Sequence, residues 1–146
     1  MFENIHKLDN DQLKKHFYPK KGWINDPNGL VYFNGYYHAF YQHLRNHEFS
    51  YNNMIKNDKA DFEAMVWGHA RSKDLVSWEE MPVALYADKE YDADGVWSGT
   101  AIVKDNRLYV FYAAIYQPDK VGFRKETVCM AYSDDGINFV KHKNNP

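Results

Sequence analysis

The stretch LVYFNGYYHAFYQ, residues 30–42, predicts the fold most directly. Two runs of aromatic and aliphatic residues flank the pair Asn34-Gly35, and such a pair between apolar runs is the strongest short-range signal for a β-hairpin. A second copy, AIVKDNRLYVFY, occupies residues 101–112, and Asp105 stands in the place of Asn34 without a gap in the alignment. The sequence therefore predicts two hairpins of the same kind, at an offset of 71 residues.

A second element repeats downstream of each hairpin. Residues 68–78, GHARSKDLVSW, resemble residues 129–139, CMAYSDDGINF: each is a strand ending in serine, then an aspartate-containing turn, then an aromatic residue. Each repeat thus holds four predicted strands, and repeating four-stranded units indicate a β-propeller. We expect an all-β chain in which residues 16–146 form about the first two blades of a propeller. Residues 1–15 are expected to form an N-terminal arm or a short helix.

The number of predicted blades is too small for a closed propeller, which needs at least about four. Two blades alone would leave an apolar blade face and several strand edges uncovered. We therefore expect either that these residues are the front of a longer protein or that the chain covers its blade faces as a homo-oligomer.

Composition excludes several classes of function. The 146 residues carry a net charge of −2, which offers no field for general nucleic-acid binding. No apolar run approaches the length of a transmembrane helix. The single cysteine, Cys129, is expected to be a buried thiol, and the absence of a possible intrachain disulfide favours a cytoplasmic location.

The segment WINDPNG, residues 23–29, is the candidate for chemistry. Asp26 precedes a proline, which favours extended backbone at Asp26, and Asn28-Gly29 favours a sharp turn. A carboxylate on a stiff backbone at the beginning of a blade's innermost strand would point toward the propeller axis. Such a carboxylate can serve as the nucleophile of a retaining glycosidase. On turn chemistry alone, the alternative is that Asp-Pro-Asn-Gly only forms a β-turn.

Several ordered blocks of this sequence resemble glycoside hydrolase family 32, the β-fructofuranosidases. They are residues 23–42, 67–78, 82–86 and 95–101, and the resemblance extends over residues 16–146. It implies a five-bladed propeller with an axial active site and retaining hydrolysis of terminal β-D-fructofuranosides such as sucrose or sucrose 6-phosphate. Family 43 enzymes, active on arabinan and xylan, share five-bladed propellers, but the Asn-Asp-Pro-Asn-Gly block at residues 25–29 and the Gly-His-Ala block at residues 68–70 resemble family 32 more closely.

The resemblance also implies roles for individual residues. Asp26 matches the family's catalytic nucleophile. The residues expected to bind substrate are Asn25, Asn28, Gln42, Trp67, Trp97 and Ser98. The family's Arg-Asp-Pro block and its Glu-Cys block, which carry the transition-state stabiliser and the acid/base, are absent, so the 146 residues alone are expected to be inactive. Trp97 also replaces the family's usual phenylalanine.

No cofactor or metal is expected. His38, His43 and His47 are close in sequence, but no aspartate or cysteine spacing completes a zinc pattern. The expected partner is a fructose-containing saccharide, with neither nucleic acid nor membrane. Lys20-Lys21 could contact a substrate phosphate or could simply be solvated. The alternative function is a non-catalytic carbohydrate-binding or scaffold propeller, which would keep the aromatic side chains and need no acid/base.

Overall fold

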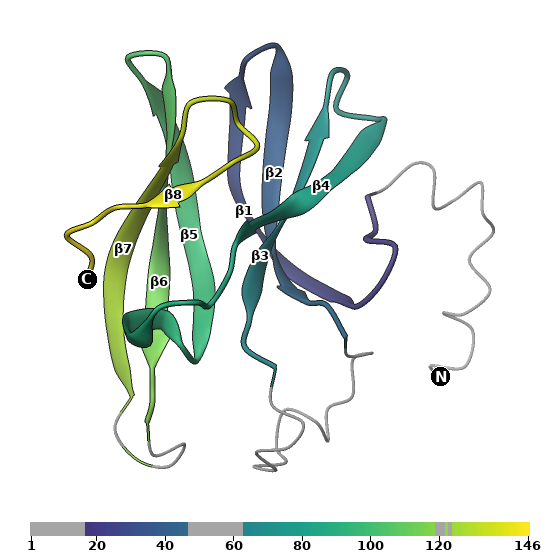
Figure 1. Ribbon diagram of the computed structural model, residues 1–146. Helices are drawn as coiled ribbons and strands as arrows, with labels where there is room; N and C mark the ends of the chain where they lie inside the picture. The colour runs from purple at the N-terminus through teal and green to yellow at the C-terminus, as the bar shows by residue number, and fades with distance from the viewer. Residues whose placement is uncertain (1–16, 47–62, 119–121, 123) are drawn as a thin grey trace, which may run out of the picture.

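Two four-stranded antiparallel sheets make up the computed structural model, which describes residues 17–46, 63–118, 122 and 124–146 (Figure 1). The first sheet, here called blade 1, consists of β1 (Trp23–Phe33), β2 (Tyr36–Leu44), β3 (Val66–Ser72) and β4 (Trp78–Leu85). The second, blade 2, consists of β5 (Gly95–Lys104), β6 (Arg107–Tyr116), β7 (Lys125–Ser133) and β8 (Val140–Lys141). In each blade the strands pair in chain order, which confirms the two predicted four-stranded repeats. The N-terminal arm or helix expected over residues 1–15 lies outside the described residues.

Both predicted hairpins are present, and both have two-residue loops. Asn34 and Gly35 have φ angles of 48° and 80°, and Asp105 and Asn106 have 50° and 58°. Positive φ at both central residues is the signature of the type I′ turn, whose twist matches that of the flanking strands. Both predicted hairpins are thus confirmed, although blade 2 has no glycine at this turn.

The aspartates of the second repeated element cap their turns. Asp74 Oδ1 accepts hydrogen bonds from the backbone N–H groups of Val76 (2.8 Å) and Ser77 (2.6 Å), and Asp135 Oδ1 accepts from Ile137 and Asn138 at 2.8 Å each. These backbone hydrogen bonds hold the pKa of both carboxyl groups below the usual range of an aspartate. The two turns are thus built alike.

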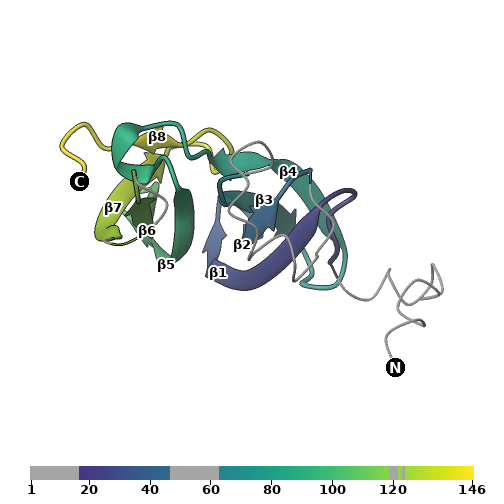
Figure 2. The same cartoon turned by 90° about the horizontal axis from the view of Figure 1, so that it is seen from below.

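The two blades pack face to face with their first strands, β1 and β5, side by side (Figures 1 and 2). Between the blades lies one apolar core that includes Phe40 and Trp67 from blade 1 and Tyr112 from blade 2. The ring of Phe40 also meets Phe139 edge-on, with centroids 5.4 Å apart. The predicted buried thiol, Cys129, belongs to the same core and is 1% exposed. This packing fixes the position of β1 relative to β5.

The connection between the blades runs from β4 through a short 3-10 helix, η2 (Glu90–Asp92), into β5. Asp92 is fully buried there and receives hydrogen bonds from Lys141 Nζ (2.5 Å) and the Tyr112 hydroxyl (3.1 Å). Met65 and Gly95 form an isolated parallel bridge, in which Val96 N–H donates to the Met65 carbonyl at 2.8 Å. The beginning of β5 is therefore anchored to both blades.

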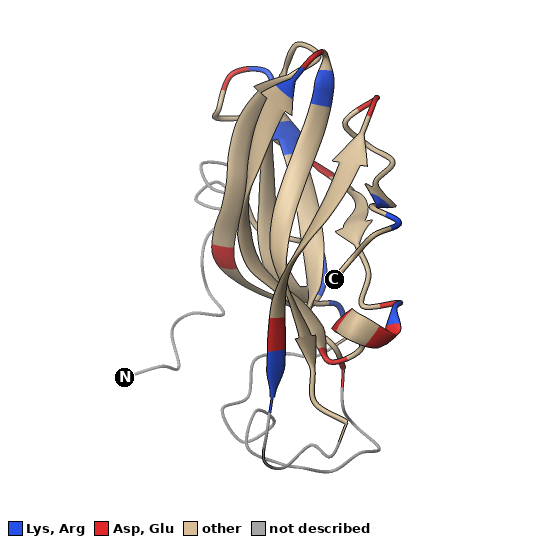
Figure 3. Cartoon of the chain, turned by 90° about the vertical axis from the view of Figure 1, so that its left-hand side faces the viewer, with Lys and Arg blue, Asp and Glu red and all other residues tan. Residues whose placement is uncertain are grey.

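Charged side chains gather at the strand ends and turns and leave most of the length of the strands free of charge (Figure 3). This distribution is expected when the blade faces pack against apolar neighbours. Among the described residues, no helix is long and apolar enough to span a membrane.

Candidate active site

Asp26 and Ser98 are each the extra residue of a β-bulge, and each is the fourth residue of its strand. Asn25 pairs with Gln42 and Pro27 with Tyr41, so Asp26 has no partner of its own on β2. In β5 the register likewise shifts between Trp97 and Gly99, which leaves Ser98 as the extra residue. Bulges bend a strand and redirect a side chain, and they are frequent next to active sites.

The two bulges bring the side chains of Asp26 and Ser98 together. The Ser98 hydroxyl donates to Asp26 Oδ2 at 2.9 Å, and Ser98 Oγ itself accepts a hydrogen bond from Gln42 Nε2 at 2.7 Å. Asp26 and Ser98 are exposed, whereas Gln42 is 7% exposed. Three residues predicted for the site, from three strands and both blades, thus form one hydrogen-bonded chain that ends on the carboxylate.

Asn28 lies beneath this chain rather than on the surface. Its side chain is 5% exposed, and its Nδ2 donates to the Asp26 carbonyl at 3.0 Å. Its Oδ1 accepts a hydrogen bond from the Gly99 N–H at 3.1 Å. Both polar atoms of the amide are therefore bonded to backbone, so the substrate-binding role predicted for Asn28 does not fit its position.

Trp67 is fully buried, which also does not fit the predicted contact with substrate. Its ring stacks on Phe40 and lies edge-on to Tyr112, and its Nε1–H donates to the Trp97 carbonyl at 2.9 Å. The physical reason is packing between the blades, which sequence spacing alone does not reveal. Trp67 therefore supports the backbone of β5 from within the core.

Asn25 and Trp97 border the Asp26–Ser98 contact from opposite strands. Asn25 is exposed and precedes the bulge of β1, and Trp97 is half-buried and precedes the bulge of β5. The guanidinium of Arg124 lies over the Trp97 ring, 4.7 Å from its centroid, and pairs with Glu126. Arg124 is a residue at this rim that the sequence did not single out, because cation–π stacking depends on a strand far along the chain.

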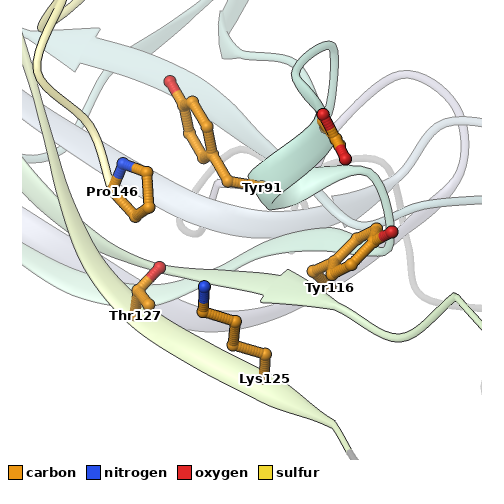
Figure 4. A pocket seen from close by; sticks show the side chains of 6 residues that line it. Tyr91, Tyr116, Lys125, Thr127 and Pro146 are labelled. Carbon is orange, nitrogen blue, oxygen red and sulfur yellow. The ribbon is translucent and has the colours of Figure 1, made fainter.

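A separate pocket of about 240 Å³ lies on blade 2 beside η2 (Figure 4). Its lining residues are Glu90, Tyr91, Tyr116, Lys125, Thr127 and Pro146. None of the residues predicted for catalysis or substrate binding lines it, so this pocket is distinct from the Asp26–Ser98 contact.

No metal centre is found among the residues that the structure describes, since no three His, Cys, Asp or Glu side chains come close enough to hold an ion. His38 and His69 are buried and hydrogen-bonded to each other at 2.9 Å. The Nδ1–H group of His43 donates to the Trp23 carbonyl at 2.9 Å. His47 lies outside the described residues. His38 and His43 thus each bond to a backbone carbonyl, of Phe33 and Trp23 respectively, and His38 also bonds to His69.

Comparison with known proteins agrees with the geometry. The family model "Glycosyl hydrolases family 32 N-terminal domain" matches residues 16–146. The sucrose-6-phosphate hydrolase of Zymomonas mobilis is 41% identical over 128 residues, which cover 86% of this chain and 23% of the relative. The chain therefore spans about a quarter of the length of the curated relatives it matches.

Solved structures show the same fold. The sucrose-6-phosphate hydrolase of Lactobacillus gasseri superposes with a TM-score of 0.74 at 27% identity, over 88% of this chain and 24% of that one. A variant of the GH32 β-fructofuranosidase of Bombyx mori, solved in complex with sucrose, gives 0.70 at 34% identity, over 91% and 25%. The two sheets are thus two blades of the propeller shared by these enzymes, as the sequence predicted.

Proposed function

The chain belongs to glycosyl hydrolases family 32, as its N-terminal domain, and we propose that it supplies the nucleophile of a retaining β-fructofuranosidase. The substrates are terminal β-D-fructofuranosides such as sucrose or sucrose 6-phosphate. The observation that carries this proposal is the exposed Asp26 carboxylate, held at 2.9 Å by the Ser98 hydroxyl in a pair of facing bulges. A β-turn role alone would not require a partner from the other blade.

In the proposed reaction Asp26 attacks the anomeric carbon C2 of the fructosyl unit. Ser98 holds Oδ2, so the other oxygen, Oδ1, forms the new ester bond while the bond from C2 to the leaving-group oxygen breaks. A carboxylic acid outside these 146 residues protonates the leaving oxygen and then, as a carboxylate, takes a proton from the water that hydrolyses the ester. In a retaining enzyme this second carboxyl group lies about 5–5.5 Å from the first.

The six other residues predicted for the site divide into two groups under this proposal. Asn25, Gln42, Trp97 and Ser98 lie around the Asp26 carboxylate and contact the fructosyl unit. Asn28 and Trp67 are buried and act on the backbone beneath it. We further propose a cytoplasmic location, which cell fractionation would test.

The experiment joins residues 1–146 to the part of the Zymomonas mobilis sucrose-6-phosphate hydrolase that follows its match to this chain. Release of fructose is measured with sucrose and with sucrose 6-phosphate, to determine which fructoside is preferred. Asp26→Asn should lower kcat by about 10⁴-fold or more, because a neutral amide cannot act as the nucleophile.

The matched control is Asp134→Asn, which removes an exposed carboxylate that pairs with Arg107 in blade 2. It should hydrolyse sucrose at the parent rate. If Asp26→Asn keeps more than a small fraction of the activity, the nucleophile is another residue. A folded parent protein that binds fructosides without cleaving them would favour the carbohydrate-binding alternative.

A further inference from the structure

Three consecutive residues of β5, Trp97 to Gly99, are each hydrogen-bonded to side chains of blade 1, and no two of them share a partner. The Trp97 carbonyl accepts from Trp67, the Ser98 hydroxyl bonds to Asp26 and Gln42, and the Gly99 N–H donates to Asn28. These are side-chain bonds across the two blades, not strand pairing. They meet at the bulge that carries Ser98.

Gly99 is fixed from its other side by β6. A Cβ atom at Gly99 would lie 1.8 Å from the Phe111 carbonyl oxygen, which is less than any real contact, so only glycine fits here. The Gly99 backbone therefore lies directly against β6 on one side and is bonded to the Asn28 amide on the other. Its position has little freedom.

Asn28 bonds in the opposite direction to the backbone of the nucleophile. Its Nδ2 donates to the Asp26 carbonyl at 3.0 Å while its Oδ1 accepts from Gly99 at 3.1 Å. One side chain thus connects the residue that carries the carboxylate with the residue that follows Ser98. Asn28 is 5% exposed, so its amide lies beneath the surface between the two bulges.

The close approach of the strands continues at the next residue. Gly29 has a φ of 54°, and a Cβ atom there would lie 3.0 Å from the Ala101 Cβ and 3.1 Å from the Phe40 ring. Gly29 therefore lets β1 approach β5 to the distance of the Ala101 methyl group. Beside this close approach, the Asn28 amide joins the backbone of the two bulges.

We infer that Asn28 is a positioning residue for the nucleophile, which acts by holding the Ser98 hydroxyl and the Asp26 carboxylate in register across the two blades. This inference rests on the proposed function and extends it, since Asn28 contacts backbone and not the sugar. A reacting group misplaced by about 1 Å can cost a factor of about 100 in rate, whereas ground-state binding by other side chains is unaffected.

The test compares Asn28→Ala, Ser98→Ala and the double variant in the protein fused as above. Asn28→Ala should lower kcat about 100-fold and leave KM within about twofold of the parent value. If Asn28 acts through Ser98, the double variant should be no slower than the slower single variant by more than about threefold. Effects that multiply would show that the two residues act independently and would overturn the inference.

Asn145→Ala is the matched control, because Asn145 makes the same kind of pair of backbone bonds at another place. Its Oδ1 accepts from the Met130 N–H at 3.1 Å and its Nδ2 donates to the Met130 carbonyl at 2.9 Å. This variant removes an equivalent set of bonds without touching β1 or β5, and its kcat should stay within about twofold of the parent. An equal loss in both variants would indicate general destabilisation and contradict the inference.

A second measurement does not depend on activity. In residues 1–146, amide hydrogen exchange at Gly99 should become at least about tenfold faster in Asn28→Ala and remain unchanged in Asn145→Ala. An unchanged exchange rate at Gly99 would overturn the inference whatever the fused protein does. A folded fused protein without hydrolysis, combined with faster exchange, would instead count against the proposed function alone.

Discussion

Blade 1 and blade 2 are built with the same turns and differ near the beginning of their first strands, β1 and β5. Both have a type I′ hairpin between the first and second strands and an aspartate-capped turn after the third. At the hairpin offset, Asp26 of blade 1 corresponds to Trp97 of blade 2, and Asn28 corresponds to Gly99. Blade 1 thus contributes the carboxylate and the bridging amide, and blade 2 contributes the hydroxyl and the backbone that receive them. The scaffold is repeated, whereas the site residues are complementary.

The buried polar groups of the two blades differ as well. Blade 1 contains the neutral pair His38 and His69, and the residues that match them in blade 2 are Tyr109 and Met130. At blade 2, Lys141 of β8 instead forms an ion pair with Asp92 of the connecting helix η2. The two blades are therefore stabilised by different kinds of polar contact, and the first two predictions below test that difference, whereas the third tests the equivalence of the hairpin turns.

The largest effect on stability is expected at Lys141. Its side chain is 9% exposed and its Nζ bonds to Asp92, Asp88 and the Tyr86 carbonyl. Lys141→Met leaves the buried Asp92 carboxylate without its cation, which costs about 3–5 kcal/mol in the free energy of unfolding. Urea denaturation measures it. Lys143→Met, at an exposed lysine two residues away, should change that free energy by less than about 0.5 kcal/mol, and equal losses would contradict the role of the ion pair.

The second prediction concerns pH and blade 1. Burial, with smaller contributions from His38 and Arg71, lowers the pKa of His69 to about 3. The unfolded chain binds a proton at this histidine near pH 6.5, and the folded chain does not until about pH 3. Stability from this group is therefore complete above pH 6.5 and is lost as the pH falls, by up to about 1.4 kcal/mol per pH unit.

Replacing His69 by the residue of blade 2, His69→Met, should remove this part of the pH dependence. The measurement is the free energy of unfolding between pH 7 and pH 4, where the parent should lose stability more steeply than the variant. His142→Met, at a half-buried histidine near the C-terminus, serves as the control and should retain the parental slope. If the free energy of unfolding falls with pH equally steeply in His69→Met and in the parent, folding does not lower the pKa of His69.

The smallest effect is expected at the hairpin loops. Asn106 has a φ of 58°, a left-handed conformation that favours glycine. Asn106→Gly gives blade 2 an Asp-Gly turn, with glycine at the same position as in the Asn-Gly turn of blade 1, and should raise the midpoint of thermal unfolding through a gain of at most about 1 kcal/mol. Gly35→Asn makes the reverse change at a position where a Cβ atom would meet nothing within 4 Å. It should lower the midpoint of thermal unfolding by a similar amount. Shifts of the same sign in both variants would contradict the equivalence of the two turns.

The features that could be predicted from the sequence are those determined by near neighbours along the chain. The Asn34-Gly35 hairpin and the cap of Asp135 depend on residues within a few positions, so their signals are complete in the sequence. The candidate nucleophile, Asp26, is likewise indicated by its local motif and by the family resemblance.

The features that could not be predicted depend on contacts between distant strands. A bulge at Asp26 or Ser98 is defined by which residue of the neighbouring strand pairs with its flanks, and no local pattern records that register. The burial of Asn28 and Trp67 follows from blade 2 packing on blade 1. For this reason their side chains were expected to bind sugar when they bind backbone.

The position of Asp26 and Ser98 near the start of their strands determines where the chain tolerates changes in length. Adding or deleting one residue between Trp23 and Asp26 would exchange the two faces of the strand and turn the carboxylate away from blade 2. The hairpin loops lie at the other end of the inner strands (Figure 1), so peptide tags or labels inserted there would leave the bulges unchanged. Protein engineering of this domain should therefore treat the first four residues of β1 and β5 as invariant in length and use the hairpin loops for insertion.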